Sequence, residues 1–142
     1  VLSLSAGSLY SQNKTIKGRV IDDTLETMIG VLITINDTVK AGITDFNGFF
    51  QIDIPVSVNK ITFSYVGLDA APIELVDKCD RIEVVMMLSG TYCFITLKHA
   101  DRKRKKRYKK LPKVHKQAFR KGIFETEYAC YKRKFVKFAD DK

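Results

Sequence analysis

The strongest chemical signal in the sequence is a run of nine residues, 102–110, of which eight carry a positive charge. Such a run can bind nucleic-acid phosphates, an anionic lipid or polysaccharide, or an acidic protein surface, and it can equally be a solvated basic connector. The single tyrosine offers a contact or stacking ring. The candidate anion-binding residues are therefore Arg102, Lys103, Arg104, Lys105, Lys106, Arg107, Tyr108, Lys109 and Lys110.

Residues that could catalyse a reaction or bind a metal are scarce, because the chain has 2 His and 3 Cys. Four of these residues match no standard zinc spacing, namely Cys93, His99, His115 and Cys130. We predict no catalytic residue, no metal site and no cofactor. A small hydrolase that uses Asp45, His99 or His115 is the alternative from another class, and it requires a cleft that brings one histidine to a carboxylate.

The three cysteines lack C-x-x-C spacing, so they predict neither a zinc ribbon nor a redox motif. An oxidising compartment would allow one bridge. Cys93 with Cys130 is the pair that would tie the C-terminal segment to the edge of the domain. Isolated buried thiols are the equal alternative.

The elements that must position these residues are β-strands over most of the chain. Apolar residues alternate with polar ones, or form short β-branched runs, and turn residues separate the runs. The expected strands lie at 16–22, 31–35, 49–54, 61–66, 73–76 and 82–88, with 92–97 as one more strand or the start of the next segment. Strands at this spacing without an intervening helix predict an all-β fold, an antiparallel sandwich of about seven strands.

One turn in this series has a specific structural role. In Thr44-Asp45-Phe46-Asn47-Gly48, we expect Asp45 to accept backbone N–H bonds and Gly48 to take a positive φ, with Asn47 between them. Asp45 could also be read as a catalytic acid, but no base or nucleophile accompanies it.

Several of these segments resemble one known family. Gly18-Arg19-Val20-Ile21-Asp22, Ile29 to Ile35, the Gly42 to Phe50 element with its G-x-T-D-x-x-G-x-F pattern, and Ile61 to Gly67 are similar to the carboxypeptidase regulatory-like domain. The resemblance covers about residues 14–88. It implies a transthyretin-like β-sandwich of the kind common in envelope proteins of Bacteroidetes. It implies neither peptidase nor transport activity. Ile29 replaces the family's usual proline, and Leu68 its usual aromatic residue.

Charge divides the chain into unequal parts. Residues 1–97 hold 7 basic and 11 acidic side chains, whereas residues 98–142 hold 18 basic and 5 acidic ones. We therefore expect a β-sandwich domain at 14–97 followed by a basic C-terminal extension at 98–142. Within the extension, we predict a short helix over residues 114–122, because they follow Pro112 and end at Gly122.

Residues 1–13 are predicted to be a signal-peptide remnant or a flexible N-terminus, since Val1 to Ser8 are small and apolar and Ala6-Gly7-Ser8 suits a cleavage site. This indicates export to the periplasm or cell envelope. No run of apolar residues in the sequence is long enough to span a bilayer as a helix.

These features together favour a non-enzymatic envelope adaptor. We expect it to engage an envelope protein or an anionic polysaccharide or lipid surface, with the basic extension adding electrostatic affinity. Nucleic acid becomes an unfavoured partner if the chain is exported. A dedicated periplasmic inhibitor or immunity-type protein is the alternative within the binding class. The oligomeric state is left open by the sequence.

Overall fold

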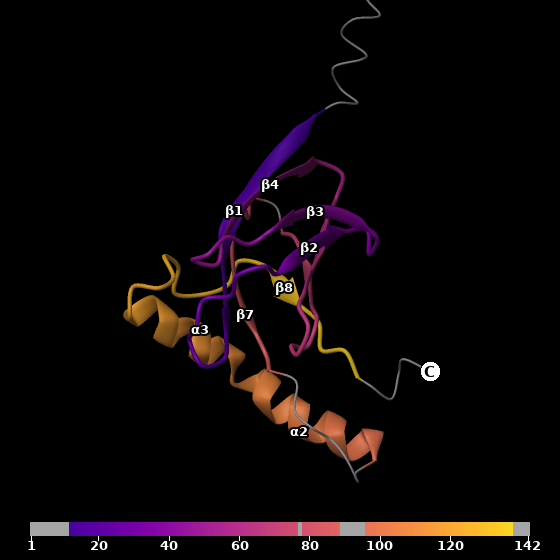
Figure 1. The fold of residues 1–142 in the computed structure, drawn as a ribbon, viewed down its shortest axis with the longest axis vertical. Helices are drawn as coiled ribbons and strands as arrows, with labels where there is room; N and C mark the ends of the chain where they lie inside the picture. Colours follow the sequence, from indigo (N-terminus) through magenta and orange to yellow (C-terminus); the bar gives the residue numbers. More distant parts are fainter. Residues whose placement is uncertain (1–11, 77, 89–95, 138–142) are drawn as a thin grey trace, which may run out of the picture.

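Two β-sheets form the body of the protein. The computed structural model describes residues 12–76, 78–88 and 96–137. One sheet has the strand order β4-β1-β7 and the other β3-β2-β5-β6-β8 (Figure 1). The strands are β1 (Asn13–Asp22), β2 (Leu32–Ile35), β3 (Val39–Ile43), β4 (Phe49–Pro55), β5 (Lys60–Ser64), β6 (Ala71–Glu74), β7 (Arg81–Met86) and β8 (Lys132–Arg133). The predicted β-sandwich architecture is therefore confirmed.

The main core lies between the two sheets and follows from the alternation of each strand. Ile52 and Ile54 of β4 are buried between exposed neighbours, and Ile61 and Phe63 of β5 repeat the pattern. Phe63 packs edge-on against Phe50, with ring centroids 5.3 Å apart. Aliphatic side chains from both sheets complete this core, so burial of the apolar faces holds the sheets together.

One strand pair differs from the predicted antiparallel arrangement. β1 and β7 are parallel, in a register that sets Gly18 opposite Ile82. A parallel pair needs a long connection, and here the whole of β2 to β6 supplies it. A side chain at position 18 would collide with the backbone carbonyl of Ile82, so the close approach of these strands depends on glycine.

The basic extension folds as two helices rather than one short helix. The first, α2 (Leu97–Lys109), contains most of the cationic run. The second, α3 (Leu111–Arg120), corresponds to the predicted helix but begins earlier, with Pro112 in its first turn. Gly122 follows the end of α3 with a φ of 77°, as a helix stop requires.

The extension packs against the sandwich. β7 is buried on both faces, because a second apolar cluster forms between its outer face and α3. This cluster contains Ile21, Val85, Met87, Leu111, Ala118 and Phe124. The two helices lie along one side of the sandwich in Figure 1, and the chain then returns to add β8 beside β6.

The sequence analysis predicts neither β3 nor β8, and in β3 the residues Lys40 and Gly42 interrupt the alternation. Of the two readings of the segment 92–97, its described residues agree with the start of the next segment, because Thr96 caps α2 and Leu97 is its first residue. Residues 92–95 lie outside the described residues, as do residues 1–11 of the predicted signal-peptide remnant.

Candidate functional site

The cationic run is held in a helix with favourable ends. The Thr96 side chain caps the N-terminus of α2 by accepting a hydrogen bond from the backbone N–H of His99, at 3.1 Å. Lys106, Arg107 and Lys109 occupy the last turn, where positive charge interacts favourably with the helix dipole. The run is therefore an ordered surface rather than an extended connector.

Two arginines of the run point into the protein. The Arg104 side chain is only 5% exposed and pairs with Asp69 at 2.9 Å and Asp101 at 3.0 Å. Arg107 pairs with Asp23 at 2.7 Å. Both arginines fasten α2 to loops of the sandwich, so they belong to the scaffold and not to the exposed anion-binding surface predicted for the whole run.

Tyr108 also has a structural role, whereas the sequence analysis predicts that its ring contacts a binding partner. Its hydroxyl donates to the backbone carbonyl of Arg133 at 2.8 Å. Its ring packs edge-on against Phe135, with centroids 5.3 Å apart. Tyr108 therefore joins α2 to the C-terminal segment and is only half-exposed.

The other six residues of the run form one exposed cationic face. They are Arg102, Lys103, Lys105, Lys106, Lys109 and Lys110. At 3.6 residues per turn these positions span about 160° of the helix surface, opposite the buried Ala100, Asp101 and Arg104. Residues 97–124 contain a single acidic residue, Asp101, and its side chain points inward.

The cationic surface continues onto α3. Exposed cations there are Lys113, Arg120 and, just after the helix, Lys121. Lys110, Lys113, Lys116 and Arg120 line a shallow depression of about 540 Å³. The charge of Lys116 is partly neutralised by Glu127, whose Oε1 lies 3.5 Å from the lysine Nζ. We call the exposed cations from Arg102 to Lys121 the helix face.

Asp45 forms a tight turn. Its Oδ1 accepts the backbone N–H groups of Asn47 and Phe49, both at 2.9 Å, and Gly48 has a φ of 82°. Gly48 also approaches the backbone carbonyl of Val20 too closely for a side chain. The carboxylate is thus occupied in holding the β3–β4 connection.

The residues of the hydrolase alternative do not meet in a cleft. His99 is exposed at the start of α2, whereas His115 is buried in α3. The side chain of His115 lies 3.1 Å from the carbonyl of Thr126, and burial lowers its pKa. Asp45 is held in its turn on another part of the molecule. His115 shares the Thr126 hydroxyl with the buried carboxylate of Glu83, but the three residues named for the hydrolase do not come together.

The sequence analysis overlooked Glu83. This carboxylate is buried in β7 and accepts the backbone N–H groups of Glu125 and Thr126 at 2.8 and 2.9 Å, together with the Thr126 hydroxyl at 2.5 Å. It anchors the loop that follows α3. The sequence feature that could have revealed Glu83 is that it is the one acidic residue within the apolar run 82–88. A carboxylate buried in such a run requires hydrogen-bond partners from elsewhere in the chain.

The disulfide differs from the predicted pair. Cys130 is bonded to Cys79, with Cα atoms 5.8 Å apart, and not to Cys93. Cys93 lies outside the described residues. The bridge still ties the C-terminal segment to the sandwich, but at the loop before β7. Within the described part of the chain, no three His, Cys, Asp or Glu side chains gather as a metal site.

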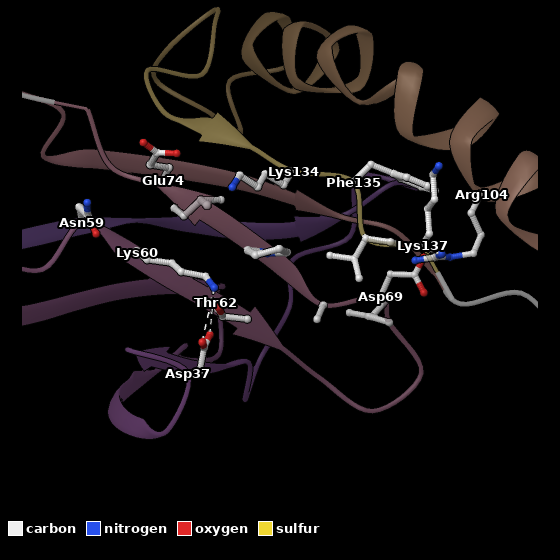
Figure 2. Close-up of a pocket in the computed structure, with 15 residues that line it drawn as sticks. Asp37, Asn59, Lys60, Thr62, Asp69, Glu74, Arg104, Lys134, Phe135 and Lys137 are labelled. Carbon is white, nitrogen blue, oxygen red and sulfur yellow. Dashed lines mark hydrogen bonds and ion pairs between the residues drawn. The ribbon is translucent and has the colours of Figure 1, made fainter. Parts of the chain in front are cut away.

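A groove of about 880 Å³ lies between the sheet strands β5 and β6 and residues 134–137 of the C-terminal segment. Its floor comes from β5 and β6, and residues 134–137 form one wall (Figure 2). Arg104 and Asp69 lie at one end, and Asp37 pairs with Lys60 near the other. No local pattern in the sequence predicts this groove, because its two sides are about sixty residues apart in the chain.

None of the described helices is both long and apolar enough to cross a membrane. A comparison with curated proteins finds no match. Among solved structures, the chain is similar to the C-terminal domain of the PapC usher, with 10% identity and a TM-score of 0.37 over 53% of this chain and 98% of that one.

A comparison with protein families matches the CarboxypepD_reg-like domain to residues 16–92, which is more than half of the chain. The matched region contains β1 from Ile16 onward and all of β2 to β7, and the Asp45 turn lies inside it. The helix face lies outside it. The chain belongs to the CarboxypepD_reg-like domain family.

Proposed function

We propose that this protein is a non-enzymatic binding module whose helix face engages an acidic protein partner or an anionic polysaccharide or lipid surface. One observation carries the proposal: the outer surfaces of α2 and α3 present only positive charge from Arg102 to Lys121. A one-signed surface of this kind attracts polyanions and speeds their association.

The anchoring of the helices supports this role. Arg104 and Arg107 are paired with carboxylates of the sandwich, so the remaining cations are presented on a fixed scaffold. A scaffold that is already ordered loses little conformational freedom on binding. The sandwich would then act mainly as the rigid support of the charged surface.

The environment of Tyr108 favours such partners over single-stranded nucleic acid. Its ring packs on Phe135 and its hydroxyl is bonded to Arg133, so it is not a free stacking platform. An exported, envelope location is part of the proposal. It is supported by the Cys79–Cys130 disulfide, because such bonds persist in oxidising compartments.

The test compares two variants of equal charge. In one, Lys106, Lys110 and Lys113 of the helix face are changed to Gln. In the other, the exposed Lys17, Lys40 and Lys78 of the sandwich are changed to Gln. Binding of the full chain to labelled polyglutamate and to vesicles containing phosphatidylglycerol is measured at low and at raised salt.

We expect the helix-face variant to lose most of its affinity for one or both probes, and the sandwich variant to keep it. Binding by the unmodified chain should weaken steeply with salt, because exposed charges are screened. Equal loss in both variants, or affinity that does not change with salt, would rule out the helix face as the binding surface.

A further inference from the structure

The groove beside β6 is a second feature that could bind a partner, and the helix face does not include it. Its only lining residue from α2 is the inward-facing Arg104. The groove exists because the β6–β8 ladder is short: it pairs Ile73 with Arg133 and Glu74 with Lys132. The backbone N–H of Lys134 still donates to the Pro72 carbonyl of β6 at 3.5 Å, and residues 134–137 form the groove wall (Figure 2).

The wall is held at several points. Arg104 donates to the Val136 carbonyl at 2.8 Å, and Tyr108 donates to the Arg133 carbonyl at 2.8 Å. The disulfide fixes the chain at Cys130, just before β8. The groove is therefore formed before any ligand arrives, which lowers the entropic cost of binding.

Charge in the groove is unevenly compensated. Asp37 is paired with Lys60, and Asp69 is paired with the buried Arg104. Lys134 and Lys137 line the same groove and make no ion pair within residues 12–76, 78–88 and 96–137. Two lysines thus remain available to a ligand, against one acidic residue of the lining, Glu74.

The surface between these lysines is largely apolar. It is lined by Pro72 on the floor and by Phe135 and Val136 on the wall, and Val136 is 40% exposed. An apolar surface with two free cations suits a ligand that carries both apolar groups and carboxylates.

The shape favours an extended chain. The floor follows β6, where the lining residues run from Ala70 to Glu74, and five extended residues span about 17 Å at the usual rise of a strand. A peptide of about five extended residues therefore fits this length better than a compact molecule does. Alternate side chains of such a peptide would face the floor and the solvent.

From the charge, surface and shape of the groove we propose that it binds an extended segment of a partner protein in which apolar and acidic side chains alternate. Its apolar side chains would pack on Pro72, Phe135 and Val136. Its carboxylates would pair with Lys134 and Lys137. This site would give the protein sequence selectivity that the helix face, as a surface of uniform charge, does not supply.

The test uses one pair of matched substitutions on a single strand. Thr62 and Ser64 lie on the same outer face of β5, but only Thr62 lines the groove. Thr62→Tyr should fill the groove, whereas Ser64→Tyr adds the same ring beside it. The probe is a short labelled peptide of alternating valine and glutamate, and a peptide of equal composition with its glutamates in one block is the reference.

Binding is measured with the full chain that carries the Lys106, Lys110 and Lys113 to Gln changes, so that attraction to the helix face is reduced. We expect Thr62→Tyr to weaken binding of the alternating peptide about tenfold or more, and Ser64→Tyr to leave it nearly unchanged. Charge reversal by Lys134→Glu with Lys137→Glu should weaken it as well. Amide chemical shifts should move in β5, β6 and residues 134–137.

Two results would overturn the groove proposal. One is equal binding by the Thr62→Tyr and Ser64→Tyr variants, and the other is equal affinity for the alternating and block peptides. If the peptide instead binds only when the helix-face lysines are intact, the groove proposal fails while the proposed function stands. If the alternating peptide still binds in the groove but neither polyglutamate nor the vesicles bind the helix face, the proposed function fails and the groove proposal stands.

Discussion

At the scale of single residues, cationic side chains within one run have different roles. Arg104 is buried between Asp69 and Asp101, whereas Lys106, two positions later, is exposed. The difference follows from helix geometry, since these positions point about 200° apart around α2. A count of charges in the run therefore overstates the surface available to a partner.

Replacement of Arg104 should reveal this structural role. Arg104→Gln removes the buried guanidinium that pairs with Asp69 and Asp101, so we expect the free energy of unfolding to fall by about 3–5 kcal/mol. Lys106→Gln on the exposed face should change it by less than about 0.5 kcal/mol. Urea unfolding of both variants checks this, and equal stability would show that the Arg104 pairs contribute nothing.

Tyr131 gives the fold a specific sensitivity to alkaline pH. Burial raises its pKa from 10.0 to about 12, and its hydroxyl donates to the Glu83 carbonyl at 2.8 Å. Between these two values the unfolded chain loses the tyrosine proton while the folded chain keeps it. The free energy of unfolding should therefore fall as pH rises from 10 to 12.

The Tyr131→Phe variant isolates this effect, because it removes the Tyr131 hydroxyl and leaves every other ionisable group in place. We expect its stability to decline less over that range than the stability of the unmodified chain. Chemical denaturation at a series of pH values provides the measurement. Parallel declines in the two proteins would contradict the assignment.

At the scale of elements, β7 is the last strand of its sheet, and side chains instead of another strand bond to the backbone carbonyls along its outer edge. The Tyr131 hydroxyl bonds the Glu83 carbonyl, and the Arg133 side chain bonds the Val85 carbonyl. Alternate residues of the C-terminal segment thus satisfy alternate carbonyls of β7. An open strand edge invites pairing with other chains, so this cover also protects the fold from aggregation.

The contact between β1 and β7 makes a sharp prediction about two glycines. Gly18→Ala places a Cβ on the carbonyl oxygen of Ile82, so the strands must separate. We expect a loss of several kcal/mol in the free energy of unfolding, or no folded protein. Gly67→Ala is the matched control, because nothing lies within 4 Å of its Cβ and only the strain of its φ of 87° remains.

Thermal unfolding followed by circular dichroism compares the two alanine variants. The Gly67 variant should lose about 1 kcal/mol, the usual penalty for a non-glycine residue in this conformation. Similar melting temperatures for the two variants would show that the β1–β7 contact tolerates a side chain.

At the scale of the whole molecule, the C-terminal extension is part of the sandwich. It adds β8, covers β7 and supplies one half of the disulfide. A chain cut after Leu97 would lose all three, so we expect it to be less stable than the full protein. Partner-binding experiments should accordingly use substitutions in the full chain.

Removal of the disulfide tests how firmly the extension is attached. The bridge spans 51 residues of sequence, and a loop of this size contributes about 4 kcal/mol by restricting the unfolded chain. Cys79→Ser with Cys130→Ser should lower the free energy of unfolding by an amount of this order. Hydrogen exchange should also become faster in residues 130–137. Unchanged exchange there would mean that the other contacts hold the segment alone.

The sequence by itself determined the elements whose signal is local. Period-two alternation predicted most strands, Pro112 and Gly122 marked the helix that became α3, and the Asp45 to Gly48 spacing gave the β3–β4 turn. The family followed from the same region. Each of these depends on residues a few positions apart, so the pattern remains visible in one dimension.

Only the tertiary structure decided which charged side chains are available to a partner. Arg104, Arg107 and Tyr108 turn inward because their partners come from remote segments, at Asp69, Asp23 and the Arg133 carbonyl. Cys130 pairs with Cys79 rather than Cys93 for the same reason. Contacts between distant segments depend on how the chain packs, and neither composition nor spacing records that.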